Sequence, residues 1–249
     1  MSSKFNLPTE TVELPSKGLL YPEDSPLNSG VVEMKYMTAK EEDILTNQNY
    51  INQGIVIDKL LESLIVDKSI NYNDLLIGDK NAIMIAARIL SYGSKYPVFY
   101  LGKELEVDLT KVNNKPLISE FEKATKNEFE FQLPQSNNKV TFRILTAGDE
   151  TAIEEEIKGL QKINKNASPE ITTRLKYIIT SVNDSRSIGD IRDFVDNYLL
   201  ATDSRALRNE YSRIMPDIDL TFEYTNNDGG KERVGIPIGL DFFWPNERV

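Results

Sequence analysis

One pattern, a strand that leads directly into a helix start, occurs twice in this chain and constrains its fold more than any other feature. In the first occurrence, Val32 to Ile44, apolar and charged residues alternate from Val32 to Tyr36, and Thr38 is followed three residues later by Glu41. Alternation predicts a half-buried strand, and a threonine with an acid three positions on predicts a helix N-terminus. The second occurrence, Val140 to Ala152, repeats the alternation, the Thr-Ala step and the acidic first turn. The sequence therefore predicts two copies of one strand-to-helix unit.

Further similarities follow both copies in the same order. The stretches that correspond are Leu60 to Asp67 with Tyr177 to Asp184, Asp74 to Ile83 with Tyr198 to Leu207, and the hairpin-like Val98 to Leu109 with Ile218 to Ile238. We therefore expect an internal duplication that places Thr38 and Thr146 at the same structural position. Unrelated positions for these two threonines would contradict it.

This order of elements predicts an α+β protein made of two related halves, each a strand leading into a helical block plus a small antiparallel β hairpin or sheet. We expect an extended N-terminal arm over residues 1–30, a first half over 31–126, and a second half over 127–249 that carries an aromatic C-terminal end. With 249 residues, of which 40% are hydrophobic, the chain can fill a core without disulfides.

Local signals place several boundaries inside the helical blocks. We expect Gly54 to interrupt the first block, Asp79 to cap a helix that ends at Gly93, and helices over Pro169 to Val182 and Ile188 to Ile214. Strands over Phe129 to Leu133 and Val140 to Leu145 should form a hairpin across residues 134–138.

Composition argues against an enzyme. The chain has no cysteine and no histidine, so thiol chemistry and the usual general base and metal ligand are missing. Glu41, Glu42 and Asp43 could be imagined as a metal or acid–base cluster, but the helix dipole favours acids in a first turn. We predict no catalytic residue, no cofactor and no metal. A Mg²⁺-dependent hydrolase that uses carboxylates stays an alternative, although no spacing supports it.

Charge and hydropathy limit the classes of partner that the chain could bind. The formal net charge is −10, and no basic stripe of the kind that follows phosphates occurs. No apolar run approaches the roughly 18 residues of a membrane span, and the N-terminus MSSKFNLPTE does not read as a secretory signal. We therefore expect no nucleic-acid partner, no membrane partner, and a cytosolic location.

Both ends of the chain are short, apolar and interrupted by proline. Residues 12–22 place Ser-Lys-Gly between two apolar pairs, which predicts a tight turn with Gly18 at positive φ. This segment either packs on its own domain or docks on a partner. At the other end, Phe242, Phe243 and Trp244 are consecutive; in a strand, neighbours alternate faces, so at least one should reach a surface and could anchor an interface. A strand with two buried faces is the alternative. The candidate partner-binding residues are Leu19, Leu20, Tyr21, Phe242, Phe243 and Trp244.

Five stretches taken together resemble the baseplate hub assembly proteins of T-even-type contractile-tailed bacteriophages. They are LPSKGLLYP, MTAKEEDIL, the segment from Leu60 to Tyr96, FRILTAGDE and the terminal FFWP. The resemblance covers nearly the whole chain in order, and its specificity lies in the combination. It implies a factor that promotes assembly of the central baseplate hub by contacts with other hub proteins, in the host cytoplasm. A permanent structural subunit of the hub is the alternative.

The resemblance also implies a metal that this chain is not built to hold. In members of that family Cys-x-x-Cys pairs often occur in the two predicted hairpins, as if forming a zinc site. Here the corresponding segments read YPVFYLGKELEVDL and FEYTNNDGGKERVGI, without cysteine. We expect the turns at Gly102 and at Asp228-Gly229-Gly230 to stand in place of the metal-binding turns.

Overall fold

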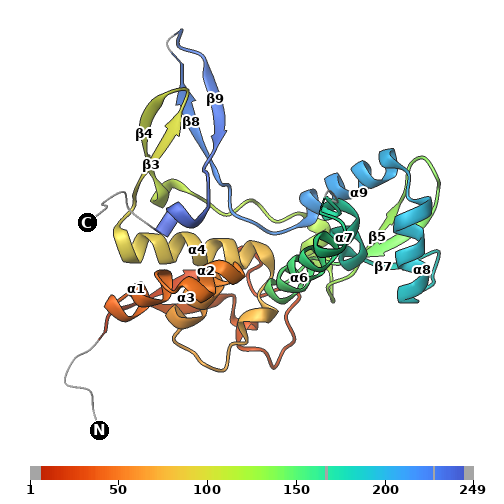
Figure 1. The fold of residues 1–249 in the computed structure, drawn as a ribbon, viewed down its shortest axis with the longest axis horizontal. Coiled ribbons are helices and arrows are strands. Elements are labelled where there is room, and N and C mark those ends of the chain that lie inside the picture. Colours follow the sequence, from red (N-terminus) through yellow and green to blue (C-terminus); the bar gives the residue numbers. More distant parts are fainter. Residues whose placement is uncertain (1–6, 166–167, 227, 244–249) are drawn as a thin grey trace.

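The computed structural model describes residues 7–165, 168–226 and 228–243, and it confirms the predicted α+β class. Two helical bodies lie side by side, and a β finger projects from one of them (Figure 1). We call residues 9–93 the first body, residues 119–214 the second body, and the two hairpins over residues 95–108 and 221–235 the finger. Buried hydrophobic residues of all three parts belong to one contiguous cluster.

The first body packs helices on a small antiparallel pair of strands. Its elements are β1 (Thr9–Glu13), β2 (Val31–Lys35), α1 (Ala39–Leu45), α2 (Gln48–Gln53), α3 (Val56–Leu64) and α4 (Ile77–Tyr92). As expected, α2 stops before Gly54, and α4 ends at Gly93, with positive φ at both glycines. The last helix, α4, lies between α1–α3 and the finger (Figure 1).

The second body has the same general design with a third strand. Its elements are α5 (Ser119–Lys123), β5 (Phe129–Gln132), β6 (Lys139–Phe142), α6 (Ala147–Ile163), α7 (Glu170–Ile178), β7 (Ile179–Val182), α8 (Ile188–Asp193), a π-helical turn η4 (Phe194–Tyr198) and α9 (Ala201–Ile214). The strands are ordered β5-β6-β7 and are antiparallel.

The finger combines hairpins from distant parts of the chain. Strands β3 (Lys95–Tyr100) and β4 (Lys103–Asp108) form one hairpin, and β8 (Thr221–Thr225) and β9 (Lys231–Gly235) form the other. The second hairpin therefore leaves the body that precedes it and lies beside the first hairpin, above α4 (Figure 1). The predicted boundaries at residues 30/31 and 126/127 stay predictions, but residues 221–243 pack with the first half in space.

The two helix starts that the repeat pattern singled out have the same local construction. Thr38 is the N-cap of α1 and Thr146 the N-cap of α6, and each follows a strand, β2 or β6. The backbone N–H of each threonine donates to the acid three residues on, Glu41 at 3.0 Å and Asp149 at 2.9 Å. A basic residue pairs with the same acid in each case: Lys35, the last residue of β2, with Glu41, and Arg143, the residue directly after β6, with Asp149.

A second similarity between the two bodies concerns the loop that joins the first two strands of each. Asp79 in α4 accepts a hydrogen bond from the backbone N–H of Ser16 at 2.9 Å, and Asp203 in α9 accepts from Gln135 at 2.7 Å and Ser136 at 2.9 Å. Both carboxylates are buried and fasten the loop between the first two strands of their body. These equivalences favour the two-copy interpretation. The duplication itself stays a prediction, which superposition of the two bodies tests.

The bodies join where two helices begin. Leu76, the N-cap of α4, forms an antiparallel bridge with Thr146. The flanking backbone bonds run from Ile77 N–H to the Leu145 carbonyl at 3.1 Å and from Ala147 N–H to the Leu75 carbonyl at 2.8 Å. This pairing fixes the start of α4 against the start of α6.

Three local expectations are wrong. The helix expected over Ile188 to Ile214 is interrupted: α8 ends at Asp193, the π-helical turn η4 follows, and α9 begins at Ala201 after the extended N-cap Leu200. The helix expected over Pro169 to Val182 ends at Ile178, because Ile179–Val182 becomes β7 and completes the sheet beside β6. Asp79 does not cap α4: the N-cap is Leu76, and the Asp79 side chain turns to the N-terminal segment instead. For Ile179–Val182 and for Asp79, a tertiary partner overrides the local signal.

Candidate protein-binding site

The N-terminal candidates sit in a segment that the chain itself anchors. Gly18 adopts the expected positive φ, at +79°. Tyr21 is buried; its hydroxyl donates to Asp79 Oδ2 at 2.6 Å and accepts from the backbone N–H of Leu76 at 2.8 Å. Ser16 Oγ also donates to Asp79 Oδ2, at 2.6 Å. The segment from residue 9 to residue 30 is thus fastened to the rest of the first body through β1 and Asp79 rather than standing free as an arm.

Burial sets the electrostatics of this anchor. Burial raises the pKa of Asp79 despite its hydrogen bonds from Ser16 and Tyr21. Burial also raises the pKa of Tyr21, and the adjacent Asp79 adds to that rise. Leu19 and Leu20 lie beside these groups and are only half-buried. These two leucines are the part of the predicted N-terminal contact that keeps accessible surface.

The C-terminal candidates behave differently from the strand that we expected. Phe242 and Phe243 lie in the 3₁₀ turn η5 (Leu240–Phe243) and are both fully buried. Residues of a 3₁₀ turn do not alternate between two faces, so neighbouring rings can enter one core. Phe242 packs edge-on against Tyr96 with ring centroids 4.9 Å apart, and against Phe243 at 5.3 Å. Trp244 lies outside the described residues. Partner contact at the six candidates stays a prediction.

Two tyrosines hold the finger together. The ring of Tyr100 in β3 packs edge-on against Tyr224 in β8, with centroids 5.2 Å apart. The Tyr100 hydroxyl donates to Glu232 of β9 at 3.3 Å, and the Tyr96 hydroxyl donates to the Pro237 carbonyl at 3.2 Å. These are the two hairpins in which the resemblance implied a zinc site. Here Tyr100 of β3 contacts the second hairpin, and Tyr96 of β3 contacts the segment that follows it.

The donor set of the finger does not match a zinc site. The expected turns at Gly102 and Gly229 both have positive φ, at +75° and +80°. In the described part of the chain, no group of three or more His, Cys, Asp or Glu side chains gathers in a way that could hold a metal ion. Structural zinc sites use cysteine and histidine, and this chain has neither.

A polar cavity lies between the two bodies. It has a volume of about 520 Å³ and is lined by residues of α2, α3 and α6 that include Asp58, Lys59, Glu62 and Lys158. Lys80 pairs with Asp58 at 2.7 Å, and Lys59 pairs with Glu62 at 2.8 Å. Because acids and lysines are paired along the cavity, we assign it to packing between the bodies.

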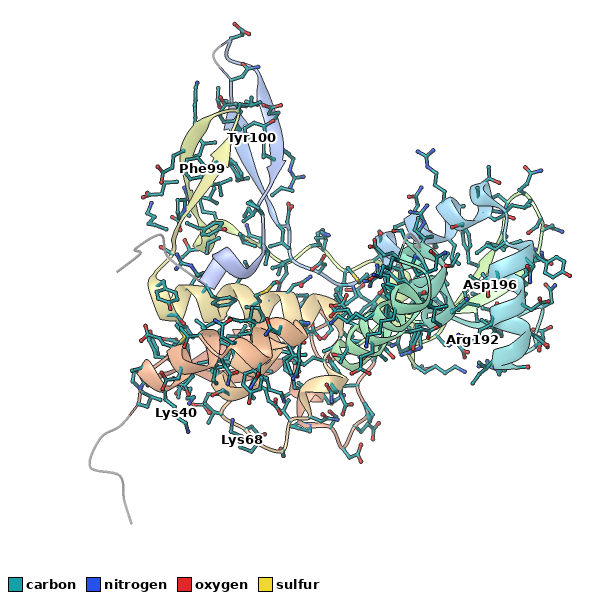
Figure 2. The ribbon with its side chains drawn as sticks, in the orientation of Figure 1. Lys40, Lys68, Phe99, Tyr100, Arg192 and Asp196 are labelled. Carbon is teal, nitrogen blue, oxygen red and sulfur yellow. The ribbon has the colours of Figure 1, made fainter. Side chains whose placement is uncertain are left out.

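The structure exposes two apolar side chains that our sequence interpretation did not select. Phe99 and Leu101, at the tip of β3, are 69% and 71% exposed. Figure 2 shows Phe99 and Tyr100 on the finger. The alternation of the KYPVFY strand was the available signal, because it places Phe99 on the opposite face from Val98 and Tyr100.

Among known proteins, a family model described as "T4 bacteriophage base plate protein" matches residues 8–244. No curated protein and no solved structure matches the chain. The matched range includes both bodies and the finger.

Proposed function

The chain belongs to the T4 bacteriophage base plate protein family, and from this premise we propose that it promotes assembly of the central baseplate hub through protein–protein contacts. The single observation that carries the proposal is the extent of the family match, which spans residues 8–244. A protein of this family interacts with other baseplate proteins. The finer statement, that the partners are hub proteins and that the chain acts during assembly, is the proposal.

The chemistry of the chain supports a role without covalent catalysis. Four of its carboxylates have structural roles: Glu41, Asp79, Asp149 and Asp203 fasten helix starts and loops. A factor of this kind accelerates assembly by holding subunits in a competent conformation or at raised local concentration. We propose that it does so in the host cytoplasm, without nucleic acid or membrane. In the described part of the chain, no helix is long and apolar enough to cross a membrane.

The test is a phage that lacks the gene for this chain. We expect infected cells to accumulate baseplate proteins without complete hubs, as seen by sedimentation and electron microscopy, and expression of the chain from a plasmid to restore them. Normal baseplates in the absence of the chain would refute the proposal. Mass spectrometry of purified tails then separates the two roles. An assembly factor is absent from tails or far below one copy per hub subunit, whereas a permanent structural subunit, the second candidate, is present at fixed stoichiometry.

A further inference from the structure

The two faces of the β3–β4 hairpin differ sharply. Tyr96 and Val98 are buried, and Tyr100 packs on Tyr224, so this face of β3 points into the finger and the core. Phe99 alternates to the other face, where it is 69% exposed, and Leu101 at the turn is 71% exposed. We call Phe99 and Leu101 the fingertip pair. Exposed aromatic and aliphatic residues close together in the chain are typical of protein contacts when they sit on a rigid support.

The turn residue is unusual for its position. Tyr100 pairs with Lys103, which leaves Leu101 and Gly102 as a two-residue loop. Both have positive φ, +49° for Leu101 and +75° for Gly102. Hairpins of this kind favour Asn or Asp at the first position, because a leucine there is strained by its side chain. Leu101 contributes little packing in return, since it is exposed. Leu101 strains the backbone of the turn and adds little packing within the chain, so we infer that it contacts another molecule.

The support beneath the pair is fixed. The ring contact with Tyr224 and the hydrogen bond from Tyr100 to Glu232 tie β3 to the second hairpin. The Tyr96 hydroxyl bond to Pro237 ties its base. The hairpin is therefore already ordered before a partner binds, so little conformational entropy would be lost on binding.

The charged residues near the fingertip pair indicate the chemistry of the surface that would bind it. Glu104 lies directly opposite Phe99 in the strand register, and Glu106 lies opposite Pro97 on the same face. Both acids are exposed; Lys95 pairs with Glu106 at 3.1 Å, and Glu104 has no ion pair among the described residues. The chain as a whole carries a formal charge of −10. The Phe99 face thus has an apolar tip beside one carboxylate, Glu104, while Lys103 lies on the opposite face with Tyr100.

We propose that the fingertip pair docks into an apolar pocket, rimmed by lysine and arginine, on a neighbouring baseplate protein. The proposal rests on the proposed function and names the surface and the chemistry of the partner. Burial of Phe99 and Leu101 supplies the affinity, and Glu104 supplies attraction to the basic rim, which is strongest at low salt.

Binding of the full chain to each other baseplate protein of the same phage, purified singly, tests the docking. The variants are Phe99→Thr, which keeps a good strand residue, and Leu101→Asn, which suits the turn. We expect each to weaken binding to one baseplate protein at least tenfold, while the melting temperature of Leu101→Asn equals or exceeds that of the wild type. Glu104→Gln should slow association and reduce its salt dependence. Ile163→Ser is the matched control, because Ile163 is 85% exposed but lies at the end of α6.

Several outcomes would overturn the docking. One is wild-type affinity of both fingertip variants for every baseplate protein that the wild type binds, and another is absence of binding to any of them. A third is self-association of the wild type, seen by light scattering and abolished by Phe99→Thr, which would make a second copy of this chain the occupant. Complementation separates this inference from the proposed function. If the gene is required but both variants restore hubs fully, the docking is wrong and the function stands; if the gene is dispensable, the function is wrong.

Discussion

The carboxylate of Glu41 is fully buried at the start of α1 and is held by three neighbours. Lys35 Nζ lies 2.7 Å from Oε1, and Ser63 Oγ donates to the same oxygen at 3.0 Å. The backbone N–H and hydroxyl of Thr38 donate to Oε2 at 3.0 and 2.6 Å. Burial alone would raise the pKa of Glu41, but the hydrogen bonds from Lys35, Thr38 and Ser63 outweigh it and lower the pKa from 4.5 to about 2.

This carboxylate should make stability depend on pH in the acid range. Because the pKa of Glu41 in the folded state lies below its ordinary value, its contribution is complete above pH 4.5 and is lost as the pH falls toward 2. We expect Glu41→Gln to lower the melting temperature at pH 6 and to approach the wild type as the pH falls through this window. Thermal melts from pH 6 to pH 2.5 measure the difference, with Glu42→Gln, at an exposed neighbour, as the control. A gap that stays constant with pH would contradict the assignment.

Gly78 marks a close approach between the start of α4 and the chain that returns from the second body. A Cβ at this position would overlap the carbonyl of Pro216 and press on Asp217, and both contacts are to backbone. We expect Gly78→Ala to cost about 2 kcal/mol or more, since backbone cannot move aside cheaply. Gly159→Ala in α6 meets open space and should stabilise the protein by about 0.5–1 kcal/mol. Urea unfolding measures the change in the free energy of unfolding for both variants. Equal changes would show that Gly78 does not lie tightly against Pro216 and Asp217.

At the scale of elements, the joint between α4 and α6 decides how the bodies sit. The flanking hydrogen bonds make Leu76 and Thr146 a non-hydrogen-bonded antiparallel pair, whose Cα atoms are close enough for a disulfide. We expect the double variant Leu76→Cys with Thr146→Cys to oxidise in air within one chain. The disulfide should raise stability over the reduced form of the same variant by up to about 4 kcal/mol.

The chain contains no cysteine, so the result has no background. Non-reducing electrophoresis, a count of free thiols and melts with and without reductant provide the measurement. Each single variant is the control, because it has no partner thiol within its chain. Free thiols that persist in the double variant under oxidising conditions would mean that the two helix starts do not meet as the structure has them.

For the whole molecule, the absence of histidine and cysteine predicts how the protein responds to chelators. Structural zinc contributes folding free energy directly, and a protein that depends on it melts when the metal is removed. We expect purified protein to contain no stoichiometric zinc by elemental analysis, and its melting temperature to be unchanged by EDTA, since ring packing of Tyr100 on Tyr224 joins the hairpins. Tightly bound zinc, or a fall in melting temperature with EDTA, would contradict this.

The sequence by itself determined the local elements whose signals lie within a few residues. The helix starts at Thr38 and Thr146, the helix end at Gly93 and the turns at Gly18 and Gly102 follow from capping and backbone preferences, which depend only on neighbours in the chain. The α+β class followed from the periodicity of apolar residues, because that periodicity decides which face each element must bury.

Only the tertiary structure decided what meets across the chain. Ile179–Val182 is a strand because β6 offers it an edge, and Asp79 holds the N-terminal segment because Ser16 and Tyr21 reach it. Phe242 and Phe243 are buried because Phe242 packs on Tyr96 of the finger and on Phe243 itself, whereas Phe99 is exposed because the second hairpin covers the other face of β3. Whether a side chain is buried depends on residues that are far away in the sequence. The sequence around that side chain does not show which distant residues will pack on it.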